Sequence, residues 1–257
     1  MKMPVLPAAC LFAVLLFPNI LPAAEKSDVP PAIDPNALVP LKRMSATLAA
    51  AKAFTYRSKT ILEVPSVTGQ FITLFSSGEI ALKRPDKLRA RFGGDAPAFD
   101  FYYDGTTVSA LAPGTKVYST AEAPPTIDAM LSGLQTETGI RMALAPLLFS
   151  DPYAVLTHGL LAAVVVGPTK VNGAECTHLA FISPGVNWEV WLEMDSRALP
   201  RRLAMTFTDR PNFPRTMIDF FDWNLHPWLL GNDTFLFRKP AGATEIPFAS
   251  VIKSANR

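Results

Sequence analysis

Apolar and polar residues alternate with a period of two along most of the chain after residue 52. Phe54 and Tyr56 alternate with Arg57 and Lys59, and the pattern returns over residues 88–92. Successive side chains of a strand point to opposite faces, so this period predicts strands with one apolar and one polar face. We expect strands over residues 54–63, 70–83, 88–92, 99–103, 106–111, 115–120, 161–171, 176–182, 188–194, 199–208 and 216–223, with the short run at 234–237 as a further candidate.

Tight turns separate these runs. Asp104-Gly105 and Asn172-Gly173 are typical two-residue hairpin turns, and the strand that precedes Pro85 must end there because proline has no backbone N–H for a ladder. Short strands linked in this way predict an antiparallel meander of about ten or eleven strands. A sheet of that size must curl or split in two.

Two regions have helical spacing instead. Asp34 followed by Pro35 is a helix start signal, and the apolar residues after it predict an amphipathic helix over about 36–52. Residues 124–157 interrupt the strands with helical or irregular segments. This insertion is very apolar, whereas an insertion between meanders is normally a polar surface loop. We therefore expect it to cover the sheet.

Together the elements predict a mainly β fold with some helix. We expect a single, strongly curved antiparallel sheet, a half-open β-barrel, with the N-terminal helix and the helical insertion covering its concave side. The chain of 257 residues is 49% hydrophobic and 18% charged, which is enough apolar material for a core, or for a core with an apolar cavity.

The N-terminus has the layout of a secretory signal peptide. Lys2 precedes an apolar stretch from Val5 to Phe17, and small residues follow around Ala23. That stretch is too short to span a membrane, which takes roughly 20 residues. We expect an exported protein, not integral to the membrane, whose signal peptide is cleaved. The expected parts are a signal peptide at 1–24, a disordered leader at 25–35, one domain at 36–240 and a C-terminal tail at 241–257.

Catalytic motifs are absent from the sequence. The three histidines, His158, His178 and His226, lie far apart, and Cys176 with His178 supplies too few ligands for zinc. Glu189 and Glu193 could suggest the paired carboxylates of a glycosidase, but the outer face of a strand explains them more simply. We expect no enzyme activity, no cofactor and no metal.

The net charge and the cysteine content further restrict the class of protein. A formal net charge of +2 gives no general attraction for nucleic acid. Cys10 lies in the predicted signal peptide, so Cys176 would be left without a partner for a disulfide. We expect Cys176 to be a small buried apolar residue whose replacement leaves binding intact.

Aromatic residues gather on the apolar faces of the expected strands. They indicate either an ordinary core or the wall of a ligand cavity, and alternation alone does not separate the two. Apolar side chains of the insertion would close such a cavity, as a mobile lid or as a fixed part of the core. The candidate ligand-binding residues are Phe54, Tyr56, Phe92, Phe99, Phe101, Tyr103, Ile127, Met130, Leu131, Leu134, Leu147 and Leu148.

A basic cluster is the second candidate site. It consists of Lys83, Arg84, Lys87, Arg89 and Arg91. The simpler hypothesis is a solvated strand face. The alternative is a docking surface for an acidic partner or for anionic lipid headgroups.

Two short segments resemble a known superfamily. They are SGEIALKRPDKLR (residues 77–89), a strand that ends in Arg-Pro before an arginine-bearing strand, and YDGTTV (residues 103–108), which forms the following hairpin. Both are similar to outer-membrane lipoprotein carriers of the LolA and LolB type. VNGAECTHL (residues 171–179) and WEVWLE (residues 188–193) resemble a family of predicted periplasmic proteins of unknown function within that superfamily. The likeness covers residues 34–237 and implies a half-barrel fold and a periplasmic location, without established catalytic residues.

Two functions fit these observations. The first is a periplasmic carrier of a lipid or another apolar small molecule, since burying a ~16-carbon chain gains about 12 kcal/mol at roughly 0.8 kcal/mol per methylene. The alternative is a protein-interaction or sensor module on the same fold, with an envelope protein as partner and no transported ligand. In both cases we expect a monomer.

Overall fold

The structure is a computed structural model that describes residues 33–138, 142–228 and 230–248. The predicted signal peptide at 1–24 and most of the predicted leader lie outside the described residues. The described part belongs to one compact unit spanning residues 31–257. Among the described residues, no helix is long and apolar enough to cross a membrane.

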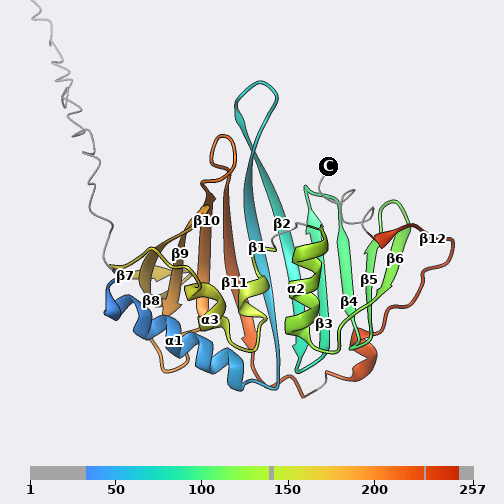
Figure 1. Cartoon of the computed structure of the whole chain (residues 1–257), viewed down its shortest axis with the longest axis horizontal. Coiled ribbons are helices and arrows are strands. Elements are labelled where there is room, and N and C mark those ends of the chain that lie inside the picture. Colours follow the sequence, from blue (N-terminus) through green and yellow to red (C-terminus); the bar gives the residue numbers. More distant parts are fainter. Residues whose placement is uncertain (1–32, 139–141, 229, 249–257) are drawn as a thin grey trace, which may run out of the picture. The chain divides into compact units, whose positions relative to one another are not determined.

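A single twelve-stranded sheet forms the body of this unit (Figure 1). Its order is β12-β6-β5-β4-β3-β2-β1-β11-β10-β9-β8-β7. Every pairing is antiparallel except that of β12 with β6. The strands are β1 (Ala53–Pro65), β2 (Phe71–Lys83), β3 (Lys87–Gly94), β4 (Phe99–Tyr103), β5 (Thr107–Ala112), β6 (Val117–Glu122), β7 (Ala162–Val171), β8 (Ala174–Ser183), β9 (Val186–Glu193), β10 (Pro200–Phe207), β11 (Arg215–Asn224) and β12 (Thr244–Glu245).

The α-helices lie against one face of the sheet (Figure 1). The Asp34 carboxylate accepts a hydrogen bond from the backbone N–H of Asn36 at 2.8 Å, so the first helix begins at Pro35, as the sequence indicated. The apolar insertion forms the next three helical elements. In chain order the helices are α1 (Pro35–Ala50), α2 (Ile127–Thr138), the 3-10 helix η1 (Ala145–Leu147), α3 (Pro152–Thr157) and the 3-10 helix η2 (Asn232–Phe235).

The core lies between the sheet and these helices. Alternate residues of the strands, such as Leu88 and Ala90 on β3, join one buried cluster with Leu41 and Met44 of α1 and Leu131 of α2. The alternation read from the sequence therefore assigned the inward and outward faces correctly. The insertion covers the sheet, as predicted, and its apolar side chains belong to the same core.

Several expectations need correction. The sheet has twelve strands rather than ten or eleven, and the extra pair is parallel. Residues 234–237 were expected to form a strand, but Thr234 and Phe235 end the 3-10 helix η2, residues 236 and 237 have no regular structure, and Phe235 is fully buried. The last residues of the predicted leader join the fold, since Ile33 bridges to Ala163. Part of the predicted tail does so too, since β12 pairs with β6. The half-open barrel stays a prediction: in the described sheet β7 and β12 are both edge strands.

Candidate functional site

Two apolar cavities lie on the helix-covered face of the sheet. The larger measures about 320 Å³ and lies between β1–β4, β11, α2 and the segment around η1. The smaller measures about 180 Å³ and lies under α1 and α3. Ala143 lines both cavities, so residues 142–148 form the partition between them.

The wall of the larger cavity is apolar almost throughout. The strands supply Ile80, Leu88, Ala90 and Phe101, and α2 supplies Leu134. The partition closes the cavity from the opposite side. Its contributing residues are Met142, Ala143, Leu144, Ala145 and Leu148.

One end of this cavity carries hydroxyl groups. Thr60, Ser76 and Thr216 line it there, and the register places Thr60 directly beside Ser76. None of the residues that line the cavity is charged. A charge would be expensive to hold in such surroundings, whereas a neutral polar group could bond to the hydroxyls. The cavity thus has an apolar body and a weakly polar end.

Two further hydroxyls lie buried on the same face of β1. Tyr56 and Ser58 are about 2% exposed, and the structure gives neither hydroxyl a hydrogen-bond partner among the described residues. Burial raises the pKa of Tyr56 above its ordinary value. Its ring packs against Phe220 and Trp223, which makes it a part of the filled core rather than of the open cavity.

The partition is fixed at its C-terminal end by side chains of two other elements. The Arg84 guanidinium donates to the carbonyls of Leu148 and Phe149, the second at 2.8 Å. The carboxylate of Asp128 on α2 accepts the backbone N–H of Ser150 at 2.9 Å. Burial lowers the pKa of Arg84, and the nearby Asp128 charge works against that shift. These contacts hold residues 148–150 close to the sheet.

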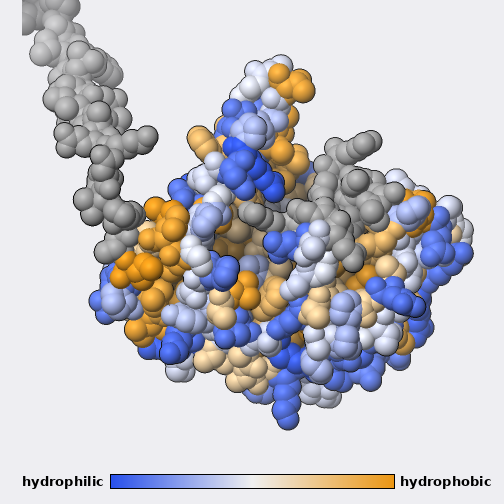
Figure 2. Space-filling model, viewed as in Figure 1, coloured by the Kyte–Doolittle hydropathy of each residue, from blue (hydrophilic) through white to orange (hydrophobic). Residues whose placement is uncertain are grey.

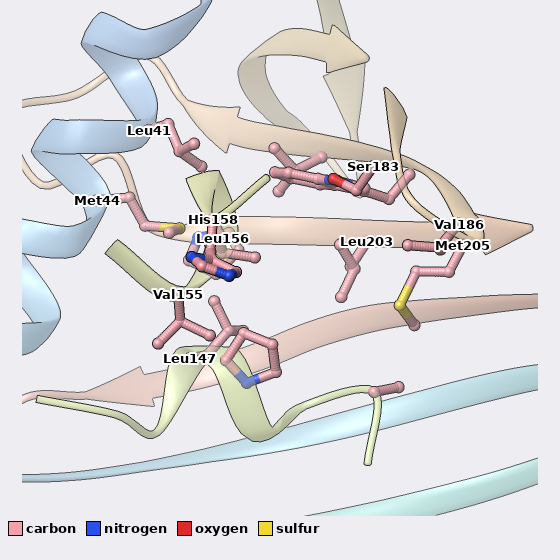
Figure 3. Close-up of a pocket in the computed structure, with 15 residues that line it drawn as sticks. Leu41, Met44, Leu147, Val155, Leu156, His158, Ser183, Val186, Leu203 and Met205 are labelled. Carbon is pink, nitrogen blue, oxygen red and sulfur yellow. The ribbon is translucent and has the colours of Figure 1, made fainter. Parts of the chain in front are cut away.

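Figure 3 shows the smaller cavity. Leu41 and Met44 enter it from α1, Leu147 from η1, and Leu203 and Met205 from β10. His158 lies at its side and is exposed to solvent. Apart from this histidine and Ser183, the lining is apolar, so the cavity offers space but few groups for orienting a ligand.

The structure divides the twelve predicted ligand-binding residues. Phe92, Phe99, Phe101, Leu134 and Leu148 line the larger cavity. Leu147 lines the smaller one. The others lie in the packed core. They are Phe54, Tyr56, Tyr103, Ile127, Met130 and Leu131.

Residues that the sequence analysis did not select complete the larger cavity. Thr60, Ser76 and Thr216 form its polar end, and Met142 and Ala143 belong to the partition. The alternation on β1 already placed Thr60 on the inward face, so this hydroxyl could have been found. Met142 and Ala143 could not, because no periodic pattern links residues 142–148 to the sheet.

The five residues of the predicted basic docking patch each make local contacts of their own. Arg84 is turned toward the partition, and the Lys87 ammonium donates to Asp86 and to the carbonyl of Asp104. Lys83 donates to Asn232 at 2.9 Å. Arg89 lies over the ring of Tyr102, and Arg91 pairs with Glu79 and Asp100. Docking by these five residues stays a prediction, and Arg84 has a structural contact instead.

The outer face of β8 to β11 carries linked polar pairs. His178 and Glu189 lie 2.9 Å apart, the His178 ring stacks on Trp191, and Arg215 also reaches Glu189. This is the outward polar face that the sequence predicted for Glu189, and it gives His178 a hydrogen-bonding partner. In the described ranges no three histidine, cysteine or acidic residues come together as a metal site. Cys176 is fully buried, and this burial raises the pKa of its thiol.

Comparison with known protein families assigns the chain to one of them. Residues 37–249 match the family described as predicted periplasmic protein (DUF2092). The chain belongs to this family. The resemblance to a family of predicted periplasmic proteins, drawn from the segments around residues 171–179 and 188–193, is thereby confirmed.

Solved structures similar to this DUF2092 protein are remote in sequence. The lipoprotein LppX of Mycobacterium tuberculosis is 13% identical, with a TM-score of 0.46 over 74% of this chain and 96% of that one. An uncharacterized conserved protein of Thermus thermophilus is 12% identical, with a TM-score of 0.47 over 82% and 99%. LprF of Mycobacterium bovis is 11% identical, with a TM-score of 0.39 over 83% and 100%. A search of curated proteins finds no match.

Proposed function

We propose that this protein binds a lipid or another apolar small molecule, without catalysis, in the larger cavity. The observation that supports the proposal is the uncharged cavity of about 320 Å³ between the sheet and the partition. Small-molecule sites typically measure roughly 300–1,000 Å³ and are lined mainly by apolar side chains with a few polar groups. The cavity fits that description.

The lining suggests how a ligand would be oriented. Each buried methylene gains roughly 0.8 kcal/mol, so the apolar part of the molecule belongs among Leu88, Phe101, Leu134 and Leu148. A neutral polar group would lie at the hydroxyl end, next to Thr60. A charged headgroup would stay outside in water, because no lining residue could compensate its charge.

The location and the finer shape of the fold complete the proposal. The family is named for a predicted periplasmic location, and an apolar molecule needs an escort through an aqueous compartment. We infer that the exported protein is such an escort. The sheet would then curve around the ligand as a half-open barrel, and the partition would take the place of a lid.

A protein-interaction module is the second candidate, and one observation favours it. Strand β7 is an edge of the sheet, and Val164, Val165 and Val166 are exposed along it. Such an edge can pair with a strand of another protein. The register shift between Val165 and Gly167, followed by Pro168, works against pairing, since bulges and prolines blunt sheet edges.

Filling the cavity tests the proposal. Ala90 lines it from β3, so Ala90→Phe should weaken binding of a fluorescent fatty-acid probe at least about tenfold, because the ring takes the space of several methylenes. Ala81→Phe is the matched control, since Ala81 lies on the outer face of the neighbouring strand, β2. Ala145→Phe enters the same cavity from the partition and serves if Ala90→Phe does not fold.

Two outcomes would contradict the proposal. One is probe binding that the two cavity variants leave unchanged while thermal melts show them folded. The other is an empty chain in native mass spectra of protein purified from the periplasm, together with no probe binding by the wild type. The second outcome would favour the interaction module.

A further inference from the structure

The hairpin formed by β1 and β2 extends past the rest of the sheet (Figure 1). The two strands pair with each other up to Pro65 and Phe71. Their outer neighbours stop earlier: β11 pairs with β1 only as far as Leu62, and β3 reaches β2 only at Ser76. Residues 63–74 therefore form a two-stranded ribbon without support on either side. At about 3.3 Å per residue it projects roughly 15 Å.

The ribbon and its tip are apolar and exposed. Glu63 at the base is the one charged residue of the ribbon, and residues 64–74 contain no charged side chain and no histidine. Val67 at the tip is 106% exposed, and Phe71 and Ile72 are each 47% exposed. Figure 2 shows one hydrophobic group at this tip, next to atoms of intermediate and polar residues. An isolated two-stranded hairpin is marginally stable in water, so an apolar one of this length favours a partner that covers it.

Both faces of the ribbon carry large apolar side chains on the tip side of Glu63, which restricts what the partner can be. Phe71 and Phe75 point to the outer face, and Ile72 and Leu74 point to the inner face, because they alternate along β2. A protein partner or a second copy of the chain would cover one face or one edge. The interior of a lipid bilayer, by contrast, would surround the tip and cover both faces at once.

The backbone at the tip suits an interface of this kind. The N–H of Ser66 donates to the carbonyl of Gln70 at 2.8 Å, and the N–H of Gly69 donates to the carbonyl of Ser66 at 3.0 Å. The turn therefore satisfies part of its own hydrogen bonding, which lowers the cost of leaving water. A projection of roughly 15 Å also exceeds the headgroup layer, which is about 5–8 Å deep on each side of a bilayer.

The loop between β10 and β11 lies beside the ribbon, because β11 pairs with β1. It carries Phe213, which is 59% exposed, and Arg210, whose guanidinium lies over the ring of Phe207. Figure 1 shows this loop and the hairpin projecting in the same direction. A second exposed aromatic residue with a nearby cation extends the surface that can contact headgroups.

The inner face of the ribbon continues the wall of the larger cavity. Thr60 and Ser76 line the polar end of that cavity. Two residues farther along each strand, Leu62 and Leu74 lie on the same face, and Ile72 follows toward the tip. An apolar path thus runs from the tip to the cavity along a single strand pair.

We propose that the β1–β2 ribbon docks the protein on a phospholipid bilayer, with Val67 and Phe71 in the interface, and that its inner face guides a ligand between the bilayer and the cavity. The evidence for docking is the exposed ribbon and its tip, and it does not depend on the cavity. The guiding role rests on the proposed function, because it requires that the cavity take up a ligand.

Flotation of the protein with vesicles tests the docking. We expect binding to phosphatidylcholine vesicles, with or without phosphatidylglycerol, and a reduction of at least about tenfold in Val67→Asp and in Phe71→Asp, since each change removes one apolar side chain from the interface. Val39→Asp is the matched control: Val39 is 56% exposed on α1, far from the tip in the sequence, and its replacement should change nothing.

Several results would overturn the docking. They are a wild type that binds neither kind of vesicle, a Val67→Asp variant that binds like the wild type, and binding that depends only on phosphatidylglycerol. Size-exclusion chromatography adds a fourth. If Val67→Asp turns a dimer into a monomer, a second copy covers the tip instead.

A transfer experiment separates the docking from the proposed function. Val67→Asp should bind a fluorescent fatty acid in solution as the wild type does but take it from vesicles at least about tenfold more slowly, in line with its lost docking. Ala90→Phe should dock normally and lose the probe. Absence of probe binding in the wild type would defeat the proposed function and leave docking intact. Equal transfer rates for Val67→Asp and wild type would defeat the guiding role.

Discussion

The two halves of the sheet are covered in different ways. Over β7 to β9 lies α1, an uninterrupted helix whose Ala37, Leu41, Met44 and Leu48 are fully buried. Over β2 to β4 the cover consists of α2 and the segment around η1. A cavity of about 180 Å³ lies where α1 meets α3 and the partition, and one of about 320 Å³ lies under the second cover. A continuous helix packs closely along a sheet, whereas a cover built from short pieces leaves space between them.

The largest loss of unfolding free energy is expected when a charge is placed under the second cover. Leu131 on α2 is 2% exposed, so Leu131→Asp should lower the free energy of unfolding by about 4 kcal/mol or more, because it buries an unpaired carboxylate. Chemical denaturation measures this directly. If the melt is unchanged and binding of a fatty-acid probe weakens, α2 is a mobile lid. If neither quantity changes, α2 does not cover the sheet in solution.

Two substitutions to alanine, one under each cover, test the difference in packing directly. Leu41→Ala should cost about 2–5 kcal/mol of unfolding free energy, since Leu41 is fully buried under α1. Leu134→Ala should cost less than half as much, because Leu134 borders the larger cavity and is only partly buried. Urea titration of both variants provides the measurement. Equal losses would show that the two covers are packed alike.

The smallest effect concerns one ion pair on the outer face, that of Arg202 on β10 with Asp219 on β11. Partial burial works to raise the pKa of Asp219, but hydrogen bonds from Arg202 and Asn172 lower it overall. The pair then stabilises the fold above the unfolded pKa of about 3.9, and this stabilisation is lost as pH falls through the lower folded pKa.

Asp219→Asn removes that dependence on pH. Between pH 5 and about pH 2.5 the wild type should lose up to about 1 kcal/mol more unfolding free energy than the variant, since partly exposed pairs contribute little. Urea titrations across this range measure the difference. Identical pH profiles would mean that Asp219 has the same pKa in both states.

The local signals in the sequence predicted most of the elements. Asp34 and Pro35 marked the start of α1, and the Asp-Gly and Asn-Gly pairs marked two hairpins. These signals succeed because they act within a few residues. Strand β12 escaped prediction because two residues carry no period, and η2 was mistaken for a strand because a short apolar run fits either element.

The cavity could be predicted only in part. Phe54 and Phe92 follow the same alternation on their strands, yet Phe54 is fully buried in the core and Phe92 lines the cavity. Alternation determines the face of a side chain but not what lies opposite it. What lies opposite a side chain depends on how far residues 142–148 reach across the sheet. Long-range contacts such as those of Arg84 determine that reach.

The pairing of β1 with β11 has a consequence for folding. Arg57 lies opposite Phe221, so the centre of the sheet joins segments at opposite ends of the domain. Strands β1 to β6 and β7 to β10 can each form as a consecutive meander, but no described strand pairing links them until β11 is present. Such a high contact order predicts slow folding, with the β1 edge open to aggregation in the meantime. A chain that emerges from its amino end must therefore wait for nearly its whole length before its first strand gains a second neighbour.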